Sequence, residues 1–147
     1  MNYFFPSLLS SPAIPSDISS SVLFTTNSGE KAIQLILRSF NLPQKSAVAI
    51  PAFVCESVPR AVLSEGLVPV FFDLKKNFAF WNDYKFEKII EQKIQAVILF
   101  HLYGFNHPDT DSIVEFCKKN RIKLIQDAAQ CYRADEYKIL RGDGIVY

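Results

Sequence analysis

The sequence predicts an α/β protein with three layers (α/β/α), in which helices cover both faces of a mostly parallel sheet. One observation is an alternation along the chain between short apolar runs, typical of buried strands, and segments whose apolar residues recur at helical spacing. The other is composition, since 147 residues with 49% hydrophobic and 21% charged residues suit one globular core. The longest apolar run, 96–100, is far too short to cross a bilayer.

The first predicted helix begins at Asn27 or Ser28, because either side chain can cap a helix. It closes at Asn41 and Pro43. Its apolar residues at helical spacing are Ile33, Ile36, Leu37 and Phe40. A short buried strand at 47–51 follows.

A second helix is predicted to begin at Ser57, because Pro59 suits a first helical turn, and to stop at Gly66. We expect Val62 and Leu63 to point inward from this helix.

The next strand is predicted at 67–73, where Pro69 favours an edge position because it cannot donate to a sheet ladder. A weak helix at 84–92 and a strong strand at 95–103 follow. Pro108 opens another helix, which ends near Asn120. Its inward residues should be Ile113, Phe116 and Cys117, and further strands are expected at 122–127 and 143–147.

A ligand site in such a sheet is expected where the strands end, because ligands bind at the carboxyl ends of parallel strands. The polar or special residues at those ends are Pro51, Asp73, His101 to Gly104, and Asp127. Asp127 has two interpretations. It is a helix cap or turn residue, or it is a partly buried carboxylate that faces a fixed cation such as a protonated pyridine nitrogen.

Charge and cysteine content exclude several classes of function. The formal net charge of +1 provides no field for nucleic acid or an acidic membrane, so we expect neither as a partner. Cys55, Cys117 and Cys131 lie far apart without metal-ligand spacing, which predicts free thiols in a reducing cytoplasm.

Two histidines receive structural interpretations. His101 at a strand end is expected to be hydrogen-bonded rather than a general base. His107 with Asp109 and Asp111 lacks further ligands at matching spacing, so a helix opening explains these residues better than a metal site, and no metal is expected.

Several stretches occur together in the order and approximate spacing of one family: "TNSGEKAIQLIL", "IPAFVCESVPRAVLSEGLVPVFFDL", "AVILFHLYG", "KLIQDAAQ" and "GDGIVY". The chain resembles the DegT/DnrJ/EryC1/StrS family of sugar aminotransferases, which use pyridoxal phosphate (PLP) and have the type I aminotransferase fold. Residues 1–26, with three prolines, then form an N-terminal arm, and 27–147 form an incomplete PLP-binding large domain.

The resemblance implies a cofactor site, residue by residue. Ser28, Gly29 and Glu30 stand where a helix start binds the cofactor phosphate, although Glu30 replaces a usual threonine. Asp127 matches the aspartate that pairs with the pyridine nitrogen, and Gln130 matches a residue that lies against the ring.

Two further positions depart from the family pattern. Cys55 stands where an aromatic residue stacks on the cofactor, and Phe53 is a possible substitute. The lysine that forms a Schiff base with the cofactor falls about six positions beyond Tyr147, so no catalytic residue is assigned in this chain. The lysines that do not fit its position, and are expected to be solvated, are Lys118, Lys119, Lys123 and Lys138.

The resemblance also implies an activity. The parent protein would transfer an amino group from an amino acid to a keto-sugar nucleotide as a cytoplasmic homodimer, and this chain would be its N-terminal piece. Two alternatives stay open: a non-catalytic remnant or binding module of the same fold, and a relative that uses the cofactor to dehydrate a sugar.

Overall fold

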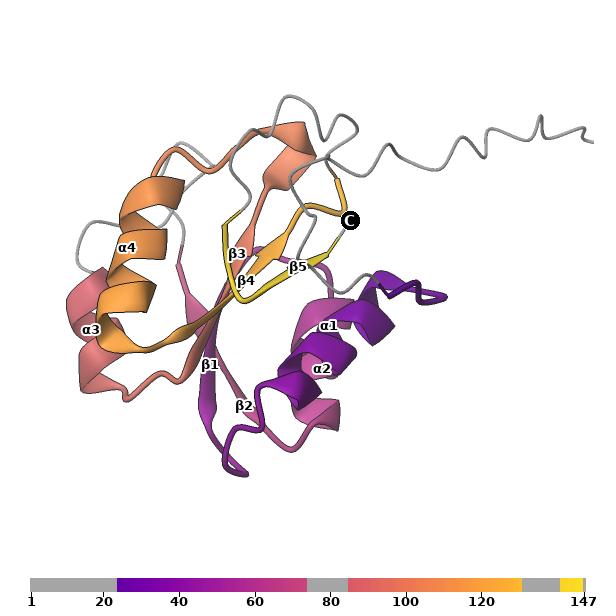
Figure 1. Ribbon diagram of the computed structural model, residues 1–147, viewed down its shortest axis with the longest axis horizontal. Coiled ribbons are helices and arrows are strands. Elements are labelled where there is room, and N and C mark those ends of the chain that lie inside the picture. Colours follow the sequence, from indigo (N-terminus) through magenta and orange to yellow (C-terminus); the bar gives the residue numbers. More distant parts are fainter. Residues whose placement is uncertain (1–23, 74–84, 131–140, 147) are drawn as a thin grey trace, which may run out of the picture.

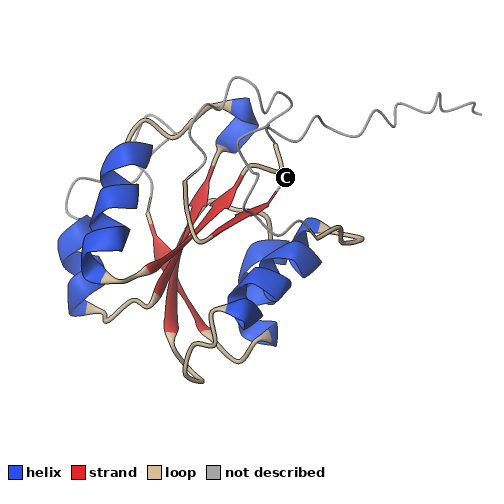
Figure 2. Cartoon of the chain, viewed as in Figure 1, coloured by secondary structure: helices blue, strands red, loops and turns tan. Residues whose placement is uncertain are grey.

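The computed structural model describes residues 24–73, 85–130 and 141–146, which form a five-stranded parallel sheet with helices on both faces (Figures 1 and 2). In chain order the elements are α1 (Gly29–Ser39), β1 (Ala47–Pro51), α2 (Ser57–Ser64), β2 (Val68–Phe72), α3 (Lys85–Glu91), β3 (Ala96–Phe100), the 3-10 turn η1 (Leu102–Gly104), α4 (Thr110–Asn120), β4 (Lys123–Asp127) and β5 (Gly144–Val146). The predicted α/β class is therefore confirmed. Within these residues no helix is long and apolar enough to span a membrane.

The strand order is β2-β1-β3-β4-β5, and all neighbouring strands are parallel. The chain moves from β1 outward to β2 and then returns to place β3 on the other side of β1. The direction of winding therefore reverses between β1 and β3. In open parallel sheets such a switch point opens a crevice at the carboxyl ends of the strands, which we call the carboxyl edge of the sheet.

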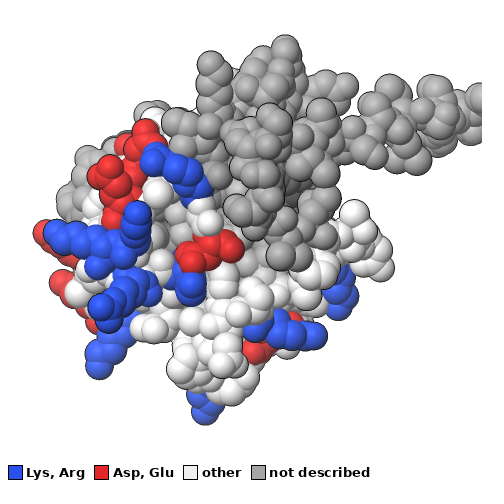
Figure 3. All heavy atoms as spheres, viewed as in Figure 1, with Lys and Arg blue, Asp and Glu red and all other residues white. Residues whose placement is uncertain are grey.

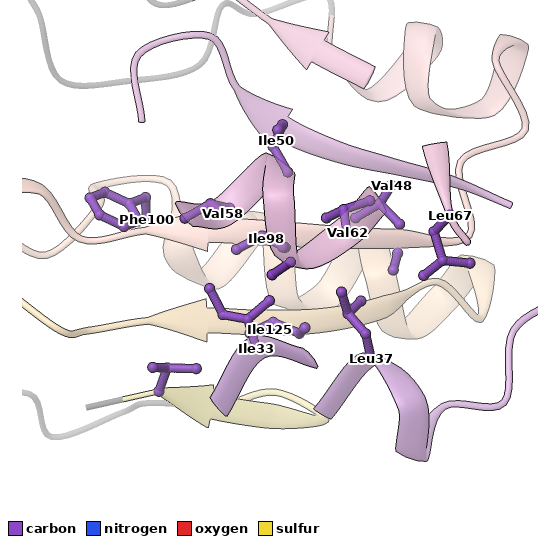
Figure 4. Close-up of a cluster of buried hydrophobic side chains, with 13 residues drawn as sticks. Ile33, Leu37, Val48, Ile50, Val58, Val62, Leu67, Ile98, Phe100 and Ile125 are labelled. Carbon is purple, nitrogen blue, oxygen red and sulfur yellow. The ribbon is translucent and has the colours of Figure 1, made fainter. Parts of the chain in front are cut away.

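Two apolar cores hold the layers together, one on each face of the sheet. Alternate strand residues point to opposite faces, so Ile98 belongs to one core and Val97 to the other. The α1/α2 core contains Ile33, Leu37, Val48, Ile50, Val58, Ala61, Val62, Leu67, Ala96, Ile98, Phe100, Ile125 and Val146 (Figure 4). The α3/α4 core contains Ala49, Phe72, Ile89, Ile94, Val97, Leu99, Ile113, Cys117, Ile122 and Leu124.

Most helix and strand signals act as predicted. Ser28 caps α1, with its hydroxyl oxygen accepting the Lys31 N–H at 3.2 Å. Gly66, after α2, has φ +71°, a conformation that glycine adopts without strain. Pro69 lies in β2, which is an edge strand of the sheet.

Two sequence predictions were wrong. Val62 is buried, but Leu63 is 61% exposed, because the next residue round a helix points about 100° away and α2 packs through Val62. The strand predicted at 95–103 ends at Phe100, because the chain then turns through η1, where Tyr103 has φ 54°.

The packing of α1 determines where its N-terminus lies. Phe40, which follows the end of α1, lies under the ammonium of Lys123 at the start of β4, 5.4 Å from ring centroid to Nζ. Ile36, one turn earlier, lies against Gly144 at the start of β5. Helix α1 therefore runs antiparallel to β4 and β5, and its N-terminus points to the carboxyl edge of the sheet.

Candidate cofactor site

Asp127 is the last residue of β4 and is only 3% exposed. Because side chains alternate along a strand, it lies on the same face as Ile125, two residues before it, which belongs to the α1/α2 core. The N-terminus of α1 lies on that face and at the same edge. The structure therefore places Asp127 and the start of α1 on one side of the sheet and at one end of it.

The Asp127 carboxylate is buried without a countercharge among the described residues. Its Oδ1 accepts the N–H of Ala129 at 3.0 Å, which makes a local turn. Burial raises the pKa of Asp127, and the hydrogen bond from Ala129 offsets this only in part. The turn interpretation is correct as far as it goes, but a turn does not require a buried acid. A cation placed against this carboxylate would favour its ionised form.

The first turn of α1 offers free backbone donors. The N–H groups of Gly29 and Glu30 donate to no acceptor in the part of the chain that the structure describes, whereas Lys31 N–H is capped by Ser28. Gly29 is exposed, and a Cβ added there would meet no atom within 4 Å. These donors and the positive end of the helix dipole suit an anion such as a phosphate.

The Glu30 side chain does not point freely into this space. Its Oε2 accepts two hydrogen bonds from Arg60 of α2, from Nε at 2.9 Å and Nη2 at 2.7 Å. Its Oε1 accepts Nε2 of Gln34, one turn along α1, at 3.3 Å. The carboxylate that replaces a threonine is thus drawn towards α2.

Gln130 connects two loops at the carboxyl edge. It is exposed, and its Oε1 accepts the N–H of Tyr103 at 2.7 Å, so the loop after β4 is joined to the turn after β3. The left-handed backbone of Tyr103 accompanies this contact. The sequence placed Tyr103 at this edge, within 101–104, but no periodicity indicates a positive φ at a tyrosine.

Behind this edge, His101 and Gln126 form a buried polar pair. His101 Nδ1 accepts the N–H of His107 at 3.2 Å, so its proton is on Nε2, which donates to Gln126 Oε1 at 2.8 Å. Burial lowers the pKa of His101, which favours the neutral ring. Gln126 Nε2 in turn donates to the carbonyl of Arg141. The expected structural role of His101 is confirmed.

Cys55 and Phe53 follow β1 at the same edge, and both are exposed. Hydrogen bonds from the side chain and then the backbone of Ser57 lower the pKa of the Cys55 thiol. The stacking of Cys55 or Phe53 against a cofactor ring stays a prediction. Cys117 is buried, which raises its pKa to about 12, and Cys131 lies outside the described residues.

The lysines excluded from catalysis lie away from Asp127, where the structure describes them. Lys118 and Lys119 are exposed at the end of α4, on a face where charges of both signs gather over α3 and α4 (left in Figure 3). Lys123 pairs with Asp143 at 2.7 Å at the opposite edge of the sheet, so it is ion-paired rather than simply solvated. Lys138 lies outside the described residues. The described residues contain no cluster of three side chains that could hold a metal ion.

The chain is an α/β protein whose parallel sheet has a buried acid, Asp127, and the start of α1 together at its carboxyl edge. Residues 19–138 match the DegT/DnrJ/EryC1/StrS aminotransferase family, and the chain belongs to this family. The predicted resemblance is confirmed.

Individual relatives agree with this assignment. The chain is 30% identical, over 118 residues and 80% of its length, to UDP-N-acetyl-3-dehydro-alpha-D-glucosamine 3-aminotransferase of Acidithiobacillus ferrooxidans, but spans 31% of that protein. It resembles the solved structure of S. venezuelae DesV (TM-score 0.65, 28% identity, 72% of this chain and 28% of that one). It also resembles NtdA from Bacillus subtilis, solved with bound cofactor PMP (TM-score 0.64, 30% identity, 71% and 24%). The chain thus spans less than a third of the length of each.

Proposed function

We propose that this chain forms the N-terminal part of the PLP-binding domain of a sugar aminotransferase, which transfers an amino group from an amino acid to a keto-sugar nucleotide. The single observation that supports it best is Asp127, a buried carboxylate with no cation against it in the described part of the chain. The relative that acts on a UDP-sugar and the PMP-bound NtdA structure favour the same assignment.

The residues present fit the cofactor. Asp127 would hold a proton on the pyridine nitrogen, because the ion pair compensates the cost of burying the carboxylate. The Gly29 and Glu30 amides would bind the phosphate at the positive end of α1. When bound, the cofactor supplies an electron-withdrawing ring, which the protonated nitrogen strengthens.

Other residues have supporting roles in this proposal. Gln130 would border the ring from the loop after β4, where its bond to Tyr103 N–H holds it. Cys55 or Phe53 would lie against a ring face. We propose a homodimer in the cytoplasm, where a reducing environment would keep the exposed Cys55 as a free thiol.

The test is ligand binding to wild type and to Asp127→Asn, with pyridoxamine 5′-phosphate as the probe. This amine cannot form an imine with surface lysines, so it reports the non-covalent site alone. Asparagine preserves size and the acceptor for Ala129 N–H but removes the charge. A charge-assisted bond contributes about 1.5–3 kcal/mol, so the affinity should fall by roughly 10- to 100-fold.

Asp111→Asn is the matched control, because it removes an aspartate charge whose side chain is 70% exposed. It should bind the probe as wild type does. Equal affinities of wild type and Asp127→Asn, or no binding by a folded wild type, would contradict the proposal.

A further inference from the structure

Glu30 creates an electrostatic problem for the proposed phosphate site. It lies in the first turn of α1, next to the backbone N–H of Gly29. A free carboxylate there would repel a phosphate dianion and cancel part of the positive potential at the helix start. Its side chain is nevertheless 21% exposed rather than fully extended into solvent, because it is bound on both sides.

Arg60 binds this carboxylate from the neighbouring helix. Two of its N–H groups donate to Glu30 Oε2, and Nη1 donates to Glu56 Oε1 at 3.2 Å. Gln34 donates to the other oxygen of Glu30, and its own Oε1 accepts Lys31 Nζ at 2.8 Å. Both carboxylate oxygens of Glu30 are therefore used within α1 and α2.

The chain contains a second pair of the same kind for comparison. Arg38 Nε and Nη2 donate to the two oxygens of Glu65 at 3.0 and 2.8 Å, and this pair joins the other end of α1 to the residue after α2. This pair therefore connects α1 and α2 near the amino edge of the sheet. The Glu30–Arg60 pair lies instead at the start of α1, beside the Gly29 and Glu30 amides, which have no acceptor among the described residues.

We propose that Arg60 is a positioning residue for the cofactor phosphate: it draws the Glu30 carboxylate towards α2 and neutralises its charge, so that the first turn of α1 accepts a dianion. This inference rests on the proposed function, and it assigns a role to a residue that the sequence alone did not indicate. Arg60 acts through Glu30 and not by touching the ring. The preference of the helix start for phosphorylated ligands is then weakened when the Glu30 carboxylate is present without Arg60.

The experiment compares two ligands that differ only in the phosphate, pyridoxamine 5′-phosphate and pyridoxamine. The dissociation constants of both are measured by ligand fluorescence for wild type, Arg60→Gln, Glu30→Gln and the double variant. The ratio of the two constants isolates the phosphate contribution, because a general loss of structure weakens both ligands alike. Arg38→Gln is the control, since it breaks the other pair between the same helices.

The two single variants should change the preference for the phosphorylated ligand in opposite directions. Arg60→Gln exposes an uncompensated Glu30 and should lower the phosphate preference by about two- to fivefold, the range for one charge near a helix terminus. Glu30→Gln leaves Arg60 uncompensated and should raise the preference. The double variant should return close to the wild-type ratio, and Arg38→Gln should not change it.

Three results separate the two proposals. If wild type binds neither ligand, or binds both equally, the proposed cofactor site is wrong. If wild type prefers the phosphorylated ligand but Arg60→Gln behaves as Arg38→Gln does, the cofactor site stands and the role of Arg60 is wrong. If Arg60→Gln is too unstable to measure, Glu30→Gln tests the role of Arg60 on its own. An unchanged or lower phosphate preference in Glu30→Gln would contradict that role.

Discussion

Replacing Gly144 with alanine should destabilise the protein, because the new methyl group would enter space that Ile36 occupies. A Cβ at this position would lie 2.4 Å from Ile36 Cγ2, 3.1 Å from Cδ1 and 3.2 Å from Cγ1. All three contacts are with one half-buried side chain, so Ile36 must change its rotamer or α1 must move. Overpacking of this kind costs about 1–3 kcal/mol of the free energy of unfolding.

The predicted cost comes from one contact, between the new methyl group and Ile36, and a double-mutant cycle can isolate this contact. Ile36→Ala removes all three atoms that the new methyl group would meet, and alone it should cost about 2 kcal/mol, near the low end for a truncated aliphatic side chain because Ile36 is only half-buried. In the double variant, Gly144→Ala should add almost nothing. The coupling energy should therefore be about 1–3 kcal/mol in favour of the double variant.

The assay is equilibrium urea unfolding of wild type, both single variants and the double variant. Strictly additive effects would show that Ile36 does not lie against Gly144. In that case the placement of the α1 N-terminus at the carboxyl edge, on which the proposed phosphate site depends, would lose its support.

Three further predictions concern stability. Asp127→Asn should stabilise the ligand-free protein at neutral pH and have little effect in strong acid. Because the pKa of Asp127 is raised in the folded state, its contribution to stability is fully present below the unfolded-state pKa and is lost as pH rises through the folded-state pKa. If the carboxylate were solvated, the difference in urea midpoint between the two proteins would not change with pH. Gly66→Ala should cost about 1–2 kcal/mol of the free energy of unfolding, because its φ of +71° strains an L-residue. The added methyl group would also meet the Gln44 side chain, but the strain is in the backbone, so urea midpoints should show that adding Gln44→Ala does not restore stability. Gln126→Leu should cost about 1–3 kcal/mol by leaving the buried Nε2–H of His101 without its acceptor, and a near-neutral effect on the thermal midpoint would argue against that bond.

The fold could be predicted largely from local signals. Apolar runs gave the strands, Ser28 and Gly66 marked helix limits, and Pro69 indicated an edge strand because its missing N–H excludes a central one. Leu63 was placed wrongly, because the sequence does not say on which side of Val62 the buried face of α2 continues: the structure buries Ala61 beside Val62 and leaves Leu63 exposed.

The site was harder to predict, because its geometry depends on contacts between distant residues. Asp127 was identified as a residue of the carboxyl edge, but its depth of burial and raised pKa follow from packing that no local pattern encodes. The Arg60–Glu30 pair joins residues thirty positions apart on two helices, and their relative register is a tertiary property. The roles of Cys55 and Gln130 came from family resemblance and stay predictions.

The most direct test of the central claim is the protonation state of the ring nitrogen in the bound ligand. Pyridoxamine 5′-phosphate labelled with nitrogen-15 in its ring would be bound to wild type and to Asp127→Asn, and its NMR shift followed with pH. With Asp127 present, the nitrogen should remain protonated at pH values where the free ligand has lost that proton, and in Asp127→Asn it should titrate as in the free ligand. The same titration curve in both proteins would show that this carboxylate does not face the ring nitrogen.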